Sequence, residues 1–349
     1  MLVASPRMLT AMGCRLMPHW FTTSFLATTV LALLFVLPDG LMAADPATAV
    51  KEGLLPKQKE VVRTTGGVNL HFTYYPSRGG KDSPVVILLH MKDSNQFVWQ
   101  DGFAERLQAL DYAVVTVDLR GHGESKGGAA GVGPIPGGNV NQPDEKAKAV
   151  RKPTSAGPRL KPADYQAMPE DLESLKREFL FKEHQAMRLN MAKMGVVGPE
   201  MGATIAAYYA NVDWNLRPYD DGAGDNRTPR GQDVKALVLI SPVTGFEGMN
   251  IVTPLQSLRN PQWNLAFLVC YGANDPQDKG QAQRIYQSLK PAKNETRMYF
   301  KSYPTKLRGT DLLGKGFDLE ARMEAFFKLH LKNLDIPWRD RRPKYDREK

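Results

Sequence analysis

Cysteine is nearly absent from this sequence. Only Cys14 and Cys270 occur among 349 residues. Two cysteines build neither a disulfide framework nor a zinc site based on thiolates. If residues 1–44 are removed, only Cys270 remains, and the rest of the chain must be stable without disulfides.

A strong excess of one charge is also missing. Lys and Arg total 46 against 37 Asp and Glu, which gives a formal net charge of +9. Hydrophobic residues make up 42% and charged residues 24%, and this ordinary usage excludes a wholly disordered chain. The pI near 9.3 permits contact with polyanions, but charge indicates partners and solubility rather than fold. The length allows one large domain or two medium ones.

Long hydrophobic runs are rare, and the notable one lies near the start. Residues 21–37 carry no charge, Arg7 and Arg15 precede them, and Pro38-Asp39-Gly40 and small residues follow. This pattern predicts an export signal peptide over 1–44, and hence a periplasmic or secreted protein with no membrane contact after cleavage. The alternative is an uncleaved membrane anchor, although 17 apolar residues are slightly short for a span. Cleavage would leave a charge of +9 − 2 + 1 = +8.

From residue 51 onward, short apolar runs alternate with helical patterns. The expected strands are an antiparallel hairpin over 61–62 and 68–75, then 84–90, 112–118, 193–198, 234–241, 265–271 and 295–303. The expected helices are 100–110, 169–191, 201–210, 277–289 and 317–334. Apolar strands that alternate with helices predict a doubly wound, mainly parallel α/β sheet with an N-terminal antiparallel hairpin, in one domain over 45–334.

Two segments do not fit this alternation. Residues 126–162 contain six prolines, and seven Lys or Arg against two acids, and they carry almost no large apolar residues. We expect a flexible insertion there, and a polyanion-binding lid is the alternative. A charged C-terminal tail covers 335–349, and its last part, 338–349, is expected to be a frayed end.

Four motifs stand in a suggestive order. They are LLHMKDSNQFVW (88–99), DLRGHGES (118–125), VVGPEMGATIAAYYA (196–210) and CYGANDP (270–276). Together they resemble the α/β-hydrolase superfamily, closest to its serine esterase, lipase and peptidase branch, over roughly 51–334. The resemblance implies the α/β-hydrolase fold and a Ser–His–acid triad. It also implies structural roles for His90 and His122.

The sequence departs from that family where the nucleophile is expected. The family motif is G-x-S-x-G on a strained strand-to-helix turn. Here the motif has Glu200 between Gly198 and Gly202, so no hydroxyl is present. Dehalogenases and epoxide hydrolases of this fold use an Asp at the position, but Glu is longer by about 1.5 Å. A misplacement of about 1 Å can cost roughly 10²-fold in rate.

The general base is missing as well. Asp275 matches the family's acid, yet residues 301–315, where the family places its histidine, contain none. Arg308 aligns there, and arginine cannot act as a general base because it does not lose its proton. The histidines of the chain are His19, His71, His90, His122, His184 and His330. His330 lies within the last expected helix, where a structural role is the simpler interpretation.

The two replacements complement each other in charge. Glu200, Arg308 and Asp275 alternate minus, plus, minus, so we expect Arg308 to bridge the two carboxylates in the place of the triad. The alternative is that this region has drifted and Arg308 points to solvent.

A pocket is a further expectation from the resemblance. The amides of Met91 and Met201 match the family's oxyanion donors, although the charge of Glu200 disfavours an anion beside them. Phe97, Trp99 and Trp214 are lining candidates, and core packing is the alternative for each. The sequence indicates no metal site and no cofactor.

These observations predict an exported, non-catalytic protein with an α/β-hydrolase fold that binds a small ligand or a partner. The rival from the enzyme class is an active hydrolase whose nucleophile is Glu200 or Ser241, the latter at the end of strand 234–241. A third possibility is polyanion contact through 126–162, without specific nucleic-acid recognition.

Overall fold

The computed structural model describes residues 53–126, 160–290 and 295–347. These residues belong to one compact unit. The predicted signal, 1–44, and nearly all of the predicted insertion lie outside the described residues. Within the described ranges, no helix is long and apolar enough to cross a membrane.

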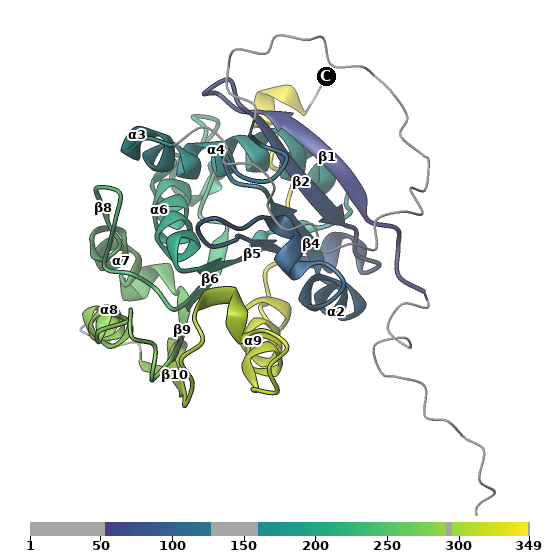
Figure 1. Ribbon diagram of the computed structural model, residues 1–349. Coiled ribbons are helices and arrows are strands. Elements are labelled where there is room, and N and C mark those ends of the chain that lie inside the picture. The colour runs from purple at the N-terminus through teal and green to yellow at the C-terminus, as the bar shows by residue number, and fades with distance from the viewer. Residues whose placement is uncertain (1–52, 127–159, 291–294, 348–349) are drawn as a thin grey trace, which may run out of the picture. The chain divides into compact units, whose positions relative to one another are not determined.

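An eight-stranded sheet forms the centre of the unit, in the order β1-β2-β4-β3-β5-β6-β9-β10 (Figure 1). Its strands are β1 (Gln58–Arg63), β2 (Asn69–Tyr75), β3 (Pro84–Leu88), β4 (Ala113–Val117), β5 (Asn190–Pro199), β6 (Val234–Ile240), β9 (Ala266–Gly272) and β10 (Met298–Tyr303). The pairs β1–β2 and β2–β4 are antiparallel, and the other pairs are parallel. The predicted mainly parallel sheet with an N-terminal hairpin is confirmed. A separate two-stranded ribbon consists of β7 (Gly245–Phe246) and β8 (Met249–Asn250).

Helices cover both faces of the sheet (Figure 1). They are α2 (Phe103–Ala109), α3 (Pro162–Gln166), α4 (Met168–Leu175), α5 (Phe181–Gln185), α6 (Met201–Asn215), α7 (Val252–Leu258), α8 (Gln281–Leu289) and α9 (Leu319–Phe327). The helices α4, α6, α7 and α8 contribute buried residues to one hydrophobic cluster, and α2 and α9 contribute to the other.

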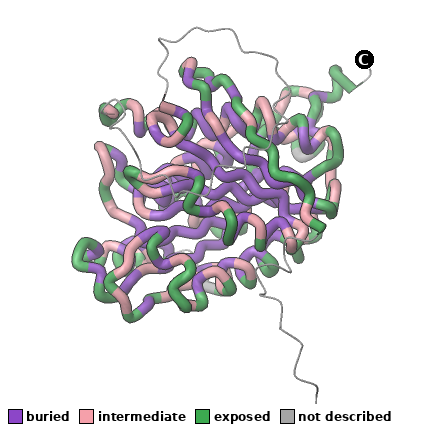
Figure 2. Tube along the Cα trace, turned by 45° about the vertical axis from the view of Figure 1, so that its right-hand side comes forward, coloured by how far each residue is buried: buried purple, intermediate pink, exposed green. Residues whose placement is uncertain are grey.

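The strand sequences explain why both faces are covered. Successive side chains of a strand point to opposite faces, and in β3 Val85 and Ile87 enter one cluster while Val86 and Leu88 enter the other. All residues of β3 are buried, and the central strands appear as buried segments in Figure 2. A continuous apolar run is therefore what a parallel strand in this position requires.

The helix expected over 169–191 is shorter than predicted. The helix α4 passes through a π-helical turn, Lys176–Leu180, into α5, which ends at Gln185. The apolar residues that follow enter β5, which begins at Asn190. Apolar spacing alone does not distinguish the end of a buried helix from the start of a buried strand. The predicted helix therefore included the first residues of β5.

The end of the tail was expected to fray, and for the described residues 338–347 this prediction is wrong. Arg341 is 5% exposed. Trp338 stacks on His184 at 5.1 Å between ring centroids and donates from Nε1 to the carbonyl oxygen of His184 at 2.8 Å. Arg341 pairs with the buried Asp233, which lies far away in the sequence, so the local sequence does not reveal this contact.

Candidate functional site

The turn between β5 and α6 keeps the geometry of a nucleophile elbow. Glu200 has φ 50° and ψ −112°, a strained conformation for a residue with a side chain. A Cβ atom on Gly198 would collide with the carbonyl oxygen of Gly202, and one on Gly202 would lie 2.7 Å from the carbonyl oxygen of His90. The tight turn therefore survives, with a carboxylate at its apex.

Asp275 lies in the turn that follows β9. Its side chain is 2% exposed, and its Oδ1 accepts a hydrogen bond from the amide of Gln277 at 2.9 Å. The carboxylate is thus held from its own loop, and Oδ2 remains available to another element.

Arg308 joins these two carboxylates. Its Nε donates to Oε1 of Glu200 at 2.9 Å, and one terminal nitrogen donates to Oδ2 of Asp275 at 2.7 Å. The side chain of Arg308 is 13% exposed, so it does not point to solvent. Each carboxylate takes one guanidinium nitrogen, which makes Arg308 a bridge between loops rather than a bidentate fork on either acid.

The bridge stabilises the charged form of Arg308. Burial lowers the pKa of this guanidinium, but the hydrogen bonds from Arg308 to Asp275 and to Glu200 outweigh it, and the net pKa is raised. Arg308 therefore remains a cation and has no lone pair with which to accept a proton. The site contains two acids and one permanent donor.

Ser241 supports the loop that carries Arg308. The serine follows β6, is fully buried and has φ 47°. Its Oγ accepts a hydrogen bond from the amide of Gly309 at 3.0 Å. The sequence analysis considered Ser241 only as a rival nucleophile. It did not predict this hydrogen bond, because Gly309 lies 68 residues away.

The two oxyanion-like amides belong to the same edge of the sheet. Met201 is the first residue of α6, and the first amides of a helix have no partner within it. Met91 follows β3 and His90, and its sulfur lies 2.9 Å from the place of a Cβ on Gly309. The amides of Met91 and Met201 thus belong to segments that pack against the turn of Glu200 and the loop of Arg308.

The histidines nearest this edge are structural. The imidazole of His90 is fully buried, donates from Nδ1 to the carbonyl oxygen of Met91 at 2.8 Å and accepts at Nε2 from the amide of Leu119 at 3.0 Å. Burial lowers its pKa to about 3. His122 bonds the carbonyl oxygen of Arg120, and burial lowers its pKa as well.

The other described histidines are also engaged away from the elbow. His330 lies 3.0 Å from the hydroxyl of Tyr299, and His184 bonds the carbonyl oxygen of Arg339. Burial lowers the pKa of each to about 4. His71 lies 3.9 Å from Glu124. In the part of the chain that the structure describes, no histidine hydrogen-bonds to the elbow carboxylate, its arginine or Asp275, and His19 lies outside that part.

The aromatic candidates do not line a common pocket here. Trp99 is fully buried and donates to the carbonyl oxygen of Leu89 at 2.8 Å. Trp214 donates to the carbonyl oxygen of Val234, at the start of β6 and so at the other end of that strand from Ser241. Phe97 is 49% exposed. The two tryptophans are core residues.

Metal chemistry has no visible ligand set in the described ranges. No group of three or more His, Cys, Asp or Glu side chains lies close enough there to hold a metal ion. At the elbow, the polar groups brought together are the side chains of Glu200, Asp275 and Arg308 and the amides of Met91 and Met201.

Solved structures resemble this protein in architecture, whereas sequence comparisons find no match. No protein-family model matches the sequence, and no curated protein matches it. An esterase of Pyrococcus furiosus matches the structure with a TM-score of 0.51 at 13% identity, over 82% of this chain and 95% of that one. An esterase of Pyrobaculum calidifontis gives 0.46 at 16%, over 81% and 88%. The esterase LipW of Mycobacterium marinum gives 0.48 at 17%, over 80% and 82%.

At such low identity the likeness to the Pyrococcus esterase shows the fold alone. The chain has the α/β-hydrolase fold, as its motifs predict. What the site does must be argued from its own residues.

Proposed function

We propose that this protein is a non-catalytic member of its fold class, in which a bridge of three charges stands in the place of the triad and the protein acts by binding a ligand or a partner. The observation that carries the proposal is the contact of Arg308 with both Glu200 and Asp275, at 2.9 and 2.7 Å. A triad needs a group that accepts a proton from the nucleophile, and a bridged guanidinium does not accept one.

The same contacts weigh against a covalent intermediate on Glu200. One of its carboxylate oxygens is bonded to Arg308, which lowers its nucleophilicity. An ester formed on Glu200 would also need a base to activate water for its hydrolysis. Arg308, which stands where the family has that base, cannot supply it.

The central test is turnover with a panel of acyl esters, together with labelling by a serine-directed phosphonate. We expect no turnover above the uncatalysed rate and no labelling. Turnover that the Glu200→Gln variant abolishes would overturn the proposal. Labelling that only the Ser241→Ala variant abolishes would overturn it in favour of a different nucleophile.

One observation favours the enzyme as a second candidate. The strained backbone of Glu200 is retained, and strain of this kind clusters at active sites. Under this alternative Glu200 is a carboxylate nucleophile, and Arg308 must move away during turnover. Trapping followed by mass spectrometry of the peptide that contains Glu200 separates the candidates, because only the nucleophile gains the mass of an acyl or alkyl group.

We also infer export, from the charge pattern and apolar run over residues 1–44. Expression of the full chain with fractionation of cells and medium tests the inference. An exported protein whose N-terminus begins after residue 44 supports a cleaved signal. A full-length chain in the membrane fraction supports the anchor instead.

A further inference from the structure

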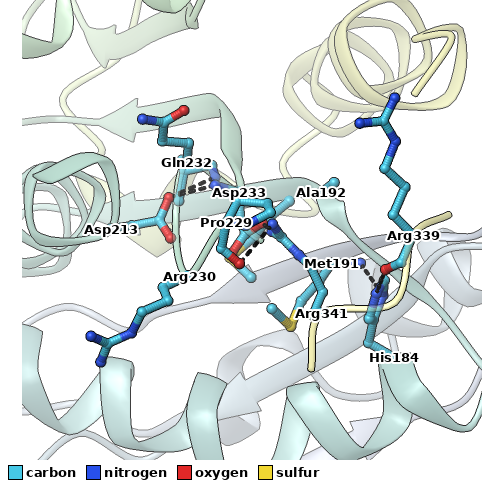
Figure 3. A network of polar contacts seen from close by, with 12 residues as sticks. His184, Met191, Ala192, Asp213, Pro229, Arg230, Gln232, Asp233, Arg339 and Arg341 are labelled. Atoms are coloured by element: carbon cyan, nitrogen blue, oxygen red, sulfur yellow. Dashed lines mark hydrogen bonds and ion pairs between the residues drawn. The ribbon is translucent and has the colours of Figure 1, made fainter. Parts of the chain in front are cut away.

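A second network of buried charges, which includes Asp213, Asp233 and Arg341, lies where β5 and β6 begin (Figure 3). The elbow lies at the other end of β5. Nζ of Lys176 lies 2.7 Å from Oδ1 of Asp213 and 3.6 Å from Oδ2 of Asp233. Arg341 of the tail forms an ion pair with Asp233. The two aspartates are fully buried, so these cations neutralise acids that water does not reach.

A cavity of about 340 Å³ lies beside this network. Its walls come from the end of α5, the starts of β5 and β6, the loop 229–232 and the tail segment 335–341. Part of the wall is apolar and is formed by Ala192, Pro229, Ile336 and Pro337. The volume lies at the lower end of the range of small-molecule sites.

The charged part of the wall is mainly cationic. Lys235, Arg339 and Arg341 face the cavity together with a single carboxylate, Asp335. Arg341 is already paired with Asp233. Among the residues that the structure describes, no carboxylate lies within ion-pair distance of Lys235 or of Arg339.

Lys235 has neutral partners in place of a counter-ion. Its Nζ donates to the carbonyl oxygen of Gln232 at 2.7 Å and lies 4.6 Å from the ring centroid of Trp214. Burial lowers the pKa of Lys235 to about 8, so the ammonium group is poorly solvated there. An anion in the cavity would stabilise its charge.

Arg341 is a buried donor at the cavity that is incompletely satisfied. Nε of Arg341 has no hydrogen-bond partner in the described structure, and the residue is 5% exposed. A buried donor without an acceptor is costly. An anionic ligand would supply acceptors to this edge.

We propose that this cavity binds a small organic anion, with its carboxylate or phosphate group held by Lys235 and Arg339 and its apolar body against Ile336 and Pro337. The site is independent of the elbow, since it uses the opposite ends of β5 and β6. The tail completes it, because Ile336, Pro337 and Arg339 all belong to the C-terminal segment.

Titration calorimetry with four probes tests the proposal: benzoate, phenyl phosphate, inorganic phosphate and the neutral analogue benzyl alcohol. We expect one saturable site for benzoate or phenyl phosphate. Their relative affinity then identifies the head group. Inorganic phosphate and benzyl alcohol each lack half of the interaction and should bind at least about tenfold more weakly, which corresponds to 1.4 kcal/mol.

Tryptophan fluorescence provides a local readout. Trp214 lies under Lys235, and Trp338 stacks on His184, which lines the cavity. Lys235→Met and Arg339→Gln should each weaken anion binding at least about tenfold. Lys301→Met is the matched control, because Lys301 also lies over an aromatic ring, that of Tyr303, but does not line the cavity.

Thermal melts establish that each variant is folded, and Arg339 is exposed, so its replacement leaves the core intact. Three outcomes overturn the proposal. Benzyl alcohol binds as tightly as benzoate, or the Lys235 and Arg339 variants bind like the unmodified protein, or none of the anions binds. Retention of anion binding in Arg308→Gln is expected, since the elbow is not involved.

Discussion

Charged side chains are paired differently at the two ends of the central strands β5 and β6. At the elbow, one guanidinium stands between two carboxylates, and Arg308 satisfies both Glu200 and Asp275. At the opposite edge, Lys176 and Arg341 neutralise buried aspartates, while Lys235 and Arg339 face a cavity without a carboxylate partner in the described chain.

The two sites differ in whether their charges are paired. The elbow has a strained turn with Glu200 at its apex, and its three charged side chains are paired with one another. The opposite edge carries no motif of the fold, yet it presents cationic groups to an open volume. Ligand binding is therefore easier to explain at the edge that the sequence motifs do not mark.

The largest effect is expected from Lys176→Met, which leaves Asp213 and Asp233 with less compensation in a site that water does not reach. Removing one partner of a buried ion network costs about 3–5 kcal/mol. Urea unfolding measures the loss. Lys182→Met is the control, since Lys182 is exposed on α5 and its replacement should change stability by less than about 0.5 kcal/mol. Equal midpoints for both variants would show that the network is not stabilising.

Arg308→Gln is expected to cost less, about 2–3 kcal/mol, because Glu200 is 22% exposed and is partly solvated without its partner. The same unfolding experiment checks this. Adding Glu200→Gln and Asp275→Asn to the variant removes the unpaired charges and should recover much of the stability. If the triple variant is no more stable than Arg308→Gln alone, the bridge is not an electrostatic one.

Acid should weaken the protein through histidines beside both edges. Burial lowers the pKa of His90 to about 3 and that of His184 to about 4, from 6.5. The unfolded chain therefore binds more protons below pH 6.5, and the stability that neutral imidazoles provide is lost as pH falls from 6.5 toward these values. Each histidine contributes a slope of at most about 1.4 kcal/mol per pH unit.

Imidazole resonances followed by NMR check that prediction residue by residue. Both rings should stay neutral down to about pH 5, where an unperturbed histidine is already charged. A ring of His184 that titrates near its ordinary pKa would mean that the docked tail does not shield it in solution.

The smallest effect is a gain of function at the elbow. Glu200→Ser with Arg308→His restores a hydroxyl and a base beside Asp275, and we expect weak ester hydrolysis because the turn and the acid are already in position. Release of a chromophore from a short acyl ester measures it. Each single variant should remain inactive. Failure of the pair would show that further groups around the elbow have changed.

Much of the fold followed from local pattern. The strands β3, β4, β6 and β9 are mostly apolar runs that end near polar or glycine-rich turns, and such runs predict buried parallel strands. The elbow could also be predicted, since the glycines on either side of Glu200 indicate a tight turn in which two stretches of backbone lie in close contact. The extent of 169–191 was not, because helix and strand share apolar residues there.

The candidate site could be predicted from the sequence only in part. The family resemblance placed Glu200, Asp275 and Arg308 at one edge, and opposite charges suggested their contact. No pattern indicated that Ser241 would hold the amide of Gly309, because a buried hydroxyl and its partner leave no periodic signal.

By itself, the sequence determined most of the strands and helices, the mainly parallel sheet, and the absence of a hydroxyl at position 200 and of an imidazole at position 308, because these depend on residue type and local spacing. The tertiary structure alone decided where the tail lies and which cations remain without counter-ions. His184 meets the carbonyl oxygen of Arg339 across 155 residues. Arg341 meets Asp233 from a segment that the local pattern treats as an exposed end. Buried charges are stable only beside a partner, and the partner is chosen by proximity in the folded chain rather than along it.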